Sequence, residues 1–244
     1  SSDLVREMYP EVSAVYVDSG LDFPEIRAHV KQTENVIRLK PSMTFREVIA
    51  NYGWIFPSKS VACKIADYKR GVPYAQMYME GKNYDGSPSP FNASLYAKWK
   101  WLADAPFPIS DKCCEIIKEK PLKKYSTDSG CKVVIGSMAS ESKRRQDAWL
   151  LTGCNAFDMR YPISKPLSFW TEQDILRYIV DHQVEIPTVY GEIIEKKGKL
   201  TTTGEQRTGC MFCLIGCHLD KPNRFQRMKE THPNIYKYCM EQLG

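Results

Sequence analysis

Short apolar runs alternate with amphipathic segments in the first part of the chain. Residues 12–17 (Val-Ser-Ala-Val-Tyr-Val) predict a buried strand that ends in the turn 18–20 (Asp-Ser-Gly), and residues 36–39 predict a second short strand. Pro24 suits the first turn of a helix, and residues 44–47 (Thr-Phe-Arg-Glu) form a capping-box pattern that begins another. Strands that alternate with helices in this way are typical of a parallel sheet.

The middle of the chain interrupts this alternation. Residues 70–92 are rich in Gly and Pro and predict a long loop, within an insertion that we place at 70–105. Residues 93–103 predict an aromatic helix. Residues 112–124 predict a helix that carries two adjacent cysteines at its start.

The alternation resumes in the second half. Residues 131–135 predict a strand, followed by a polar, basic stretch that leads into a helix ending near residue 151. Residues 156–162 predict another strand, and residues 171–179 a capped helix. Beyond a cysteine-rich turn, two further helices are predicted near 221–230 and 232–242.

These elements predict an α/β fold: a Rossmann-like, mostly parallel sheet with helices on both faces, plus a C-terminal cysteine-rich helical segment. Ligands of such sheets bind at the carboxyl ends of the strands. Two polar loops follow predicted strands, at 18–20 and at 136–145, and both are therefore candidate binding loops.

Composition narrows the class of protein. The 244 residues have a formal net charge of +5, which suits a small anionic substrate or a nucleic acid. No run of about 18 apolar residues occurs, and residues 1–20 do not resemble a signal peptide. We therefore expect a cytoplasmic protein with no membrane partner, whose nine cysteines are reduced.

Four of these cysteines suggest a metal centre. Cys113 and Cys114 are adjacent, whereas Cys210 and Cys213 form a CxxC pair further along the chain. Four thiolates suit tetrahedral zinc or an iron–sulfur cluster. Adjacent cysteines chelate one small ion poorly but reach different irons of a cluster, so we predict 4Fe–4S, with zinc as the alternative. Cys217 is interpreted as a core residue, and buried structural thiols remain the alternative for all of them.

The loop at 136–145 has the chemistry of an anion site. Gly136 allows a close approach of the backbone, Ser142 lies at a helix start, and Arg145 can hold phosphate or sulfate oxygens. A solvated basic helix start is the alternative. The aromatic residues Tyr96, Trp99 and Trp101 could stack on a base, but core packing is the preferred interpretation.

Four longer segments resemble the phosphoadenylyl-sulfate (PAPS) reductase family of the adenine nucleotide α-hydrolase-like (PP-loop) superfamily. They are 111–125 (DKCCEIIKEKPLKKY), 135–157 (IGSMASESKRRQDAWLLTGCNAF), 164–179 (SKPLSFWTEQDILRYI) and 207–236 (RTGCMFCLIGCHLDKPNRFQRMKETHPNIY). Residues 15–26 (VYVDSGLDFPEI) are similar to the family's second loop. The resemblance implies an adenine nucleotide, either ATP or PAPS/APS, bound at the strand ends.

The resemblance also assigns residues to roles. Glu141, Ser142 and Arg145 match the family's ESxxR pattern, and Asp18, Ser19 and Gly20 resemble its adenosine-side loop. Cys113, Cys114, Cys210 and Cys213 match the cluster motif of adenylyl-sulfate reductases. The implied division is an adenine nucleotide α-hydrolase-like domain at 1–205 and a cysteine-rich segment at 206–244 that completes the cluster site.

Two features of the family are not found. A Ser-Gly-Gly-Lys-Asp-Ser phosphate loop is expected before the helix that begins the chain, and we expect that the sequence is truncated there. The Glu-Cys-Gly-Leu/Ile-His tail, which carries the nucleophile of sulfonucleotide reductases, is absent. Cys239 is the only thiol near that end and a weak catalytic candidate, with a core position preferred, so the catalytic residue stays unknown.

Three functions follow. The first is reductive sulfonucleotide chemistry beside a 4Fe–4S cluster, with a reductant protein as partner. The second is ATP-dependent sulfur transfer to tRNA or DNA. The third is a non-catalytic, metal-stabilised nucleotide-binding or redox-sensing module.

Overall fold

The computed structural model describes residues 2–243. They form two compact units, and the chain passes from one unit to the other several times. Unit 1 comprises residues 2–18, 22–40 and 120–208. Unit 2 comprises residues 19–21, 41–119 and 209–243. The predicted boundary at 205/206 lies close to the last crossing, at 208/209, but unit 2 also includes the middle of the chain.

Unit 1 contains every named strand. Its first elements pair Ala14–Val17 (β1) with Val36–Leu39 (β2) in parallel, with Ala14 opposite Val36. The other elements in chain order are α1 (Ser2–Met8), α2 (Pro24–Gln32), α8 (Lys120–Ser129), β3 (Val133–Val134), η3 (Ala139–Glu141), α9 (Lys143–Thr152), β4 (Asn155–Ala156), β5 (Ile163–Ser164), α10 (Glu172–Asp181), η4 (Thr188–Tyr190), β6 (Ile193–Lys196) and β7 (Lys199–Thr202).

The mixture of helices and short parallel strands confirms the α/β class. The strands do not form one sheet, however. β1 and β2 are separate from a three-stranded sheet in which β5 pairs with β3 in parallel and with β4 antiparallel. β6 and β7 form an antiparallel hairpin on their own. Each ladder is two to four residues long.

Unit 2 is built from helices. They are α3 (Phe45–Tyr52), α4 (Lys59–Lys69), α5 (Pro73–Met79), α6 (Pro90–Trp99), η1 (Lys100–Ala103), α7 (Lys112–Cys114), the single-turn π-helix η2 (Glu115–Glu119), α11 (Arg224–Thr231) and α12 (Pro233–Gln242). The most completely buried large side chains of the described residues all lie here: Val48, Ile65, Leu102 and Ile117. Unit 2 therefore carries the better-packed core.

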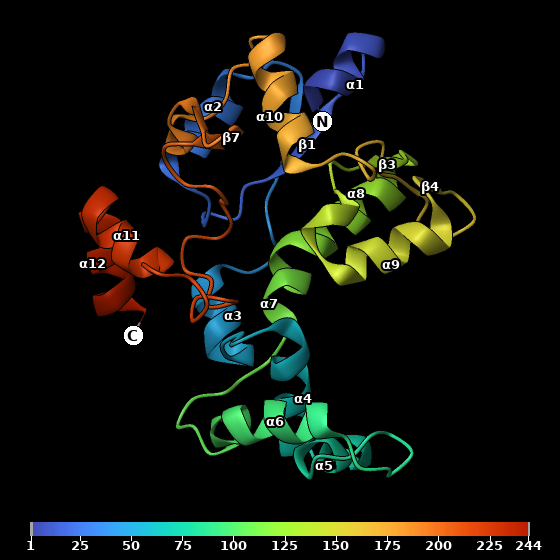
Figure 1. The fold of residues 1–244 in the computed structure, drawn as a ribbon, viewed down its shortest axis with the longest axis vertical. Coiled ribbons are helices and arrows are strands. Elements are labelled where there is room, and N and C mark those ends of the chain that lie inside the picture. Colours follow the sequence, from blue (N-terminus) through green and yellow to red (C-terminus); the bar gives the residue numbers. More distant parts are fainter. Residues whose placement is uncertain (1, 244) are drawn as a thin grey trace. The chain divides into compact units, whose positions relative to one another are not determined.

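A helical lobe, which we define as residues 59–103, makes up one part of unit 2. Its helices α4, α5 and α6 and the turn η1 pack on one another, as Figure 1 shows. The prediction of a long loop at 70–92 was wrong here, because α5 lies within it. Pro73 begins α5, and Ala75 and Met79, one turn apart, are buried against the lobe.

Local signals located most of the other elements correctly. The capping box predicted at Thr44 is present, since its hydroxyl accepts a hydrogen bond from the Glu47 N–H at 3.3 Å. The strand predicted at 156–162 was wrong beyond Ala156, because Phe157, Met159 and Tyr161 are exposed in a connection rather than paired in a sheet. The hairpin β6–β7 was not predicted.

Within residues 2–243, none of the helices combines the length and the hydrophobicity that crossing a lipid bilayer requires.

Candidate functional site

Backbone pairing places the adjacent cysteines of unit 2. The Trp54 N–H donates to the Pro108 carbonyl at 2.8 Å, and the Ser110 N–H donates back to Trp54 at 2.9 Å. α7 begins two residues later. Gly53 makes this close approach feasible: its φ is 91°, and a Cβ there would lie 2.2 Å from the Pro108 oxygen. Cys113 and Cys114 are thereby held beside α3, against which α7 packs.

The CxxC pair reaches the same region through its apolar neighbours. Met211 and Phe212, between the two cysteines, are both buried. The Phe212 ring lies 6.1 Å from Phe45, and the Met211 N–H donates to the Leu21 carbonyl at 2.8 Å. The Cys213 N–H donates to Cys210 at 3.0 Å, which closes the turn. The apolar residues among these thiols therefore anchor the turn in the core of unit 2.

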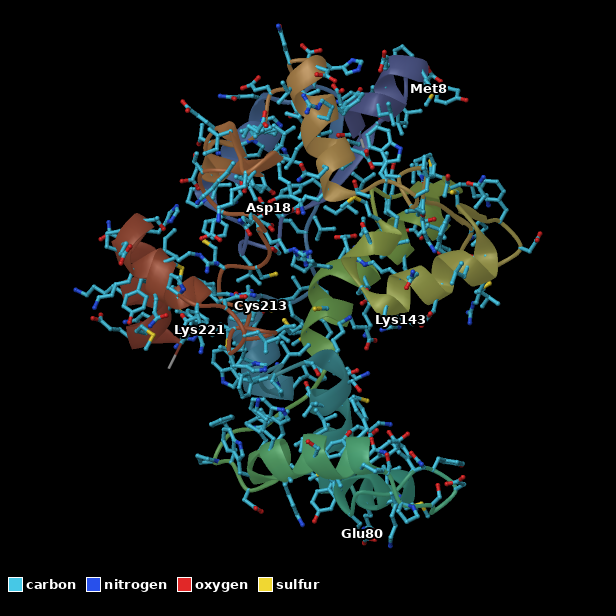
Figure 2. The ribbon with its side chains drawn as sticks, viewed as in Figure 1. Met8, Asp18, Glu80, Lys143, Cys213 and Lys221 are labelled. Atoms are coloured by element: carbon cyan, nitrogen blue, oxygen red, sulfur yellow. The ribbon has the colours of Figure 1, made fainter. Side chains whose placement is uncertain are left out.

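All four predicted cysteines line one cavity, which we call the cysteine cavity. Cys113 and Cys114 come from α7, whereas Cys210 and Cys213 come from the turn almost a hundred residues further along the chain. The other lining residues are Phe45, Ile49, Gly53, Trp54, Ile55, Ile117, Lys118, Phe212 and Leu214. Figure 2 marks Cys213 on the segment that precedes α11.

The electrostatics of the cavity reflect this convergence. Burial raises the pKa of Cys113 to about 12, and the thiols of Cys114, Cys210 and Cys213 add to that rise. Burial also raises the pKa of Cys114, against the opposing effect of the Lys59 ammonium. The raised pKa values favour the protonated thiols of Cys113 and Cys114, so metal binding to these two residues would release protons.

The donor chemistry suits a sulfur-ligated centre, but the space is tight. The cavity has a volume of 20 Å³, which is about the room for one water molecule. Among residues 2–243, no group of three or more His, Cys, Asp or Glu side chains is arranged to hold one metal ion.

The second candidate region lies in unit 1, where two loops leave the carboxyl ends of the parallel strands β3 and β5. The Ala139 N–H donates to the Ser168 carbonyl at 2.8 Å, and the Ser140 hydroxyl to the Trp170 carbonyl at 3.3 Å. Between these loops lies a pocket of 400 Å³, which we call the α9 pocket. It is lined by Ala139, Ser140, Ser142, Lys143, Gln146, Trp149, Ser168, Phe169, Trp170 and Thr171.

Ser142 is the predicted anion residue that lines this pocket. Its hydroxyl accepts the Arg145 N–H at 3.3 Å and caps α9, whose first residue, Lys143, is marked in Figure 2. The helix start presents backbone N–H groups and a positive dipole end. Gly136, Glu141 and Arg145 do not line the pocket: the Arg145 guanidinium pairs with the Glu141 carboxylate, which also accepts the Met138 N–H at 3.0 Å.

The loop 165–171 was missed as part of this pocket. The sequence offered a signal for it, because the loop (KPLSFWT) directly follows the strand at 163–164, as candidate binding loops do. Phe169 and Trp170, together with Trp149, give the pocket an aromatic wall.

The predicted adenosine-side residues lie where the chain passes between units. Asp18 follows β1 in unit 1, where its carboxylate accepts a hydrogen bond from Arg27 at 3.2 Å. Ser19 and Gly20 belong to unit 2, where the Ser19 hydroxyl accepts the Leu21 N–H at 3.2 Å. Their role in nucleotide binding stays a prediction.

Cys239, the weak catalytic candidate, is buried in α12. Burial raises the pKa of its thiol, which makes it a poor nucleophile near neutral pH. Its position agrees with the preferred interpretation as a core residue. Tyr96 and Trp99 are likewise buried, as the core interpretation predicted, whereas Trp101 is exposed.

Parallel strands with a pocket at their carboxyl ends are typical of ligand-binding α/β proteins. Residues 87–220 match the model of the phosphoadenosine phosphosulfate reductase domain, and these 134 residues are more than half of the 244-residue chain. The chain belongs to this family, which supports a sulfonucleotide-related function. A search of curated proteins found no match.

Proposed function

We propose that this chain binds an adenine sulfonucleotide and takes part in its reduction, with a 4Fe–4S cluster on Cys113, Cys114, Cys210 and Cys213. The convergence of these four thiols on one cavity carries the proposal. Two segments that lie almost a hundred residues apart in the sequence contribute four thiols to the lining of a single cavity. Such a donor set is typical of iron–sulfur ligation.

The anionic part of the nucleotide is assigned to the start of α9. The backbone N–H groups and the Ser142 hydroxyl would donate hydrogen bonds to phosphate or sulfate oxygens. Arg145 would add charge after exchanging its Glu141 partner for the ligand. The aromatic wall of the α9 pocket would exclude water from one side of the bound group.

The reaction itself requires an external reductant. Two thiols of a reductant protein would supply two electrons and be oxidised to a disulfide. Adenylyl sulfate would thereby be reduced to sulfite, with AMP as the leaving group. When bound, the cluster would supply a fixed local charge rather than electrons. The buried Cys239 is not assigned as the nucleophile.

The test is iron, zinc and acid-labile sulfide analysis of anaerobically purified protein, with adenylyl sulfate and ATP binding measured on the same sample. We expect about four irons and four sulfides per chain and broad brown absorption. Sulfite release with a dithiol reductant should follow. A colourless, zinc-loaded protein contradicts the cluster, and a loaded protein that binds adenylyl sulfate without releasing sulfite contradicts the reductase.

Sulfur transfer to tRNA or DNA is the second candidate, because Cys239 is buried with a raised pKa and is therefore a poor nucleophile for sulfonucleotide reduction. ATP-to-AMP turnover stimulated by nucleic acid would favour it. Metal binding without nucleotide affinity would instead favour a non-catalytic module.

A further inference from the structure

The helical lobe at 59–103 separates its aromatic side chains into two sets. Tyr96, Trp99 and Leu102 are buried and hold α6 and η1 against the other helices. Phe91 and Trp101 point outward instead, with exposed fractions of 73% and 53%. Packing of the lobe therefore explains the first set and leaves the second without a structural role.

The exposed rings share a stripe with a lysine. Phe91 and Lys98 are seven residues, or two helical turns, apart on α6 and so lie on one face. Trp101 follows Lys98 by three residues, as η1 continues α6 in a 3₁₀ turn that aligns such positions. Lys100 is also exposed and lies next to Trp101. Two exposed rings and two exposed lysines thus lie along the outer surface of α6 and η1.

The charge of the lobe favours an anionic ligand. Residues 59–103 contain seven Lys or Arg against three Asp or Glu, a difference of +4 in a chain whose net charge is +5. The three acids have partners within the lobe. Asp67 pairs with Arg70, Glu80 pairs with Lys82 at 2.7 Å, and Asp85 accepts from Ser87. Among residues 2–243, Lys98 and Lys100 form no ion pair, and the Lys98 ammonium lies 5.0 Å from the centroid of the Trp99 ring.

We propose that this stripe binds single-stranded nucleic acid, with bases stacked on Phe91 and Trp101 and phosphates contacted by Lys98 and Lys100. Exposed rings beside unpaired lysines suit an unpaired strand, because its bases offer flat faces for stacking and its backbone carries regular negative charge. The inference goes beyond the proposed function and does not depend on the chemistry at either candidate site.

The experiment uses the full chain and 20-nucleotide oligo(dT) and oligo(U) carrying a fluorescent label, with anisotropy as the readout and no nucleotide substrate present. The test variants are Phe91→Ala, Trp101→Ala and the double variant Lys98→Ala/Lys100→Ala. Phe157→Ala is the matched control, because Phe157 is an exposed ring (58%) in unit 1. Circular dichroism verifies that each variant is folded.

We expect each lobe ring to contribute about 5- to 150-fold in affinity, as for bases stacked on aromatic side chains. The lysine variant should lower the slope of log affinity against log salt by about 1.4 for a single strand. Phe157→Ala should change neither quantity. Binding to oligo(dT) but not to oligo(U), or the reverse, supports the proposal and shows whether the ligand is DNA or RNA.

Three outcomes overturn the proposal: no binding of either oligonucleotide at 0.1 M salt, affinities unchanged by all three lobe variants, or tighter binding of a duplex than of a single strand. A protein that docks on the stripe while oligonucleotides do not also contradicts it. Sulfite release is measured separately, so its failure bears on the proposed function alone.

Discussion

The cysteine cavity and the α9 pocket differ in how the chain builds them. The cavity joins two segments separated by almost a hundred residues and lies in the buried part of unit 2. The α9 pocket joins two loops at neighbouring strand ends and is open to solvent, with an exposed Phe169 on its rim. A centre that must exclude water needs long-range packing, whereas an anion site needs only a strand end and a helix start.

The largest predicted effect tests the cavity. Cys210→Ser should abolish cluster binding, because the substitution removes one of four thiolates and a serine hydroxyl is a weak ligand for iron. Iron content and the visible absorbance measure the loss. Cys131→Ser is the matched control, since Cys131 is exposed in unit 1 and should leave both unchanged. Equal iron content in the two variants would remove Cys210 from the ligand set.

A smaller effect is expected at the anion loop. Arg145→Ala should weaken sulfonucleotide binding by about tenfold or more, because a charge-assisted hydrogen bond contributes roughly 1.5–3 kcal/mol. Isothermal titration measures the affinity.

Glu141→Gln tests the same loop from the other side. It removes the carboxylate that now holds Arg145, while its amide oxygen can still accept the Met138 N–H. The same titration should show that the variant binds the sulfonucleotide as tightly as the wild-type protein or more tightly. A loss like that of Arg145→Ala would mean that Glu141 itself contacts the ligand.

Cys239→Ala separates core packing from catalysis. Removal of the buried sulfur should lower the free energy of unfolding by roughly 1–2 kcal/mol, because the packed core relaxes only partly around the space left. Chemical denaturation measures this change. Sulfite release by the folded fraction should stay at the wild-type rate, and a rate lowered a thousandfold would reinstate Cys239 as the nucleophile.

The smallest effect concerns the helix beside the cavity. Thr44→Ala should lower the free energy of unfolding by about 1 kcal/mol, the usual contribution of an N-cap side chain. Hydrogen bonds from the Thr44 N–H and hydroxyl lower the pKa of Glu47 below its ordinary value of 4.5. The part of the capping box that the Glu47 carboxylate contributes is therefore present above about pH 4.5 and is lost as pH falls through the folded-state pKa, whereas the bond from the Glu47 N–H to the Thr44 hydroxyl remains. Thermal unfolding of both proteins at pH 7 and pH 3 should show the difference between them shrink in acid.

The sequence by itself determined the local elements and the chemistry they carry. Residues 36–39 form the predicted strand, Thr44 and Thr171 cap the predicted helices, and Ser142 begins α9 at a strand end. Each of these depends on side chains within a few positions of one another, so their spacing alone is informative. The cysteine motifs likewise identified four thiols of one kind before any contact was known.

Only the tertiary structure decided which of these parts meet and which side chains remain outside. Whether Cys113 and Cys210 share a cavity, and whether Trp99 is buried while Trp101 is exposed, depends on contacts between segments far apart in the chain. The position of the loop 165–171 at the α9 pocket also depends on such contacts. So does α5, whose short apolar stripe is buried only because α4 and α6 pack against it. Spacing along a chain specifies hydrogen bonds within a turn. Burial depends instead on which segments pack together, and the local sequence pattern does not predict this.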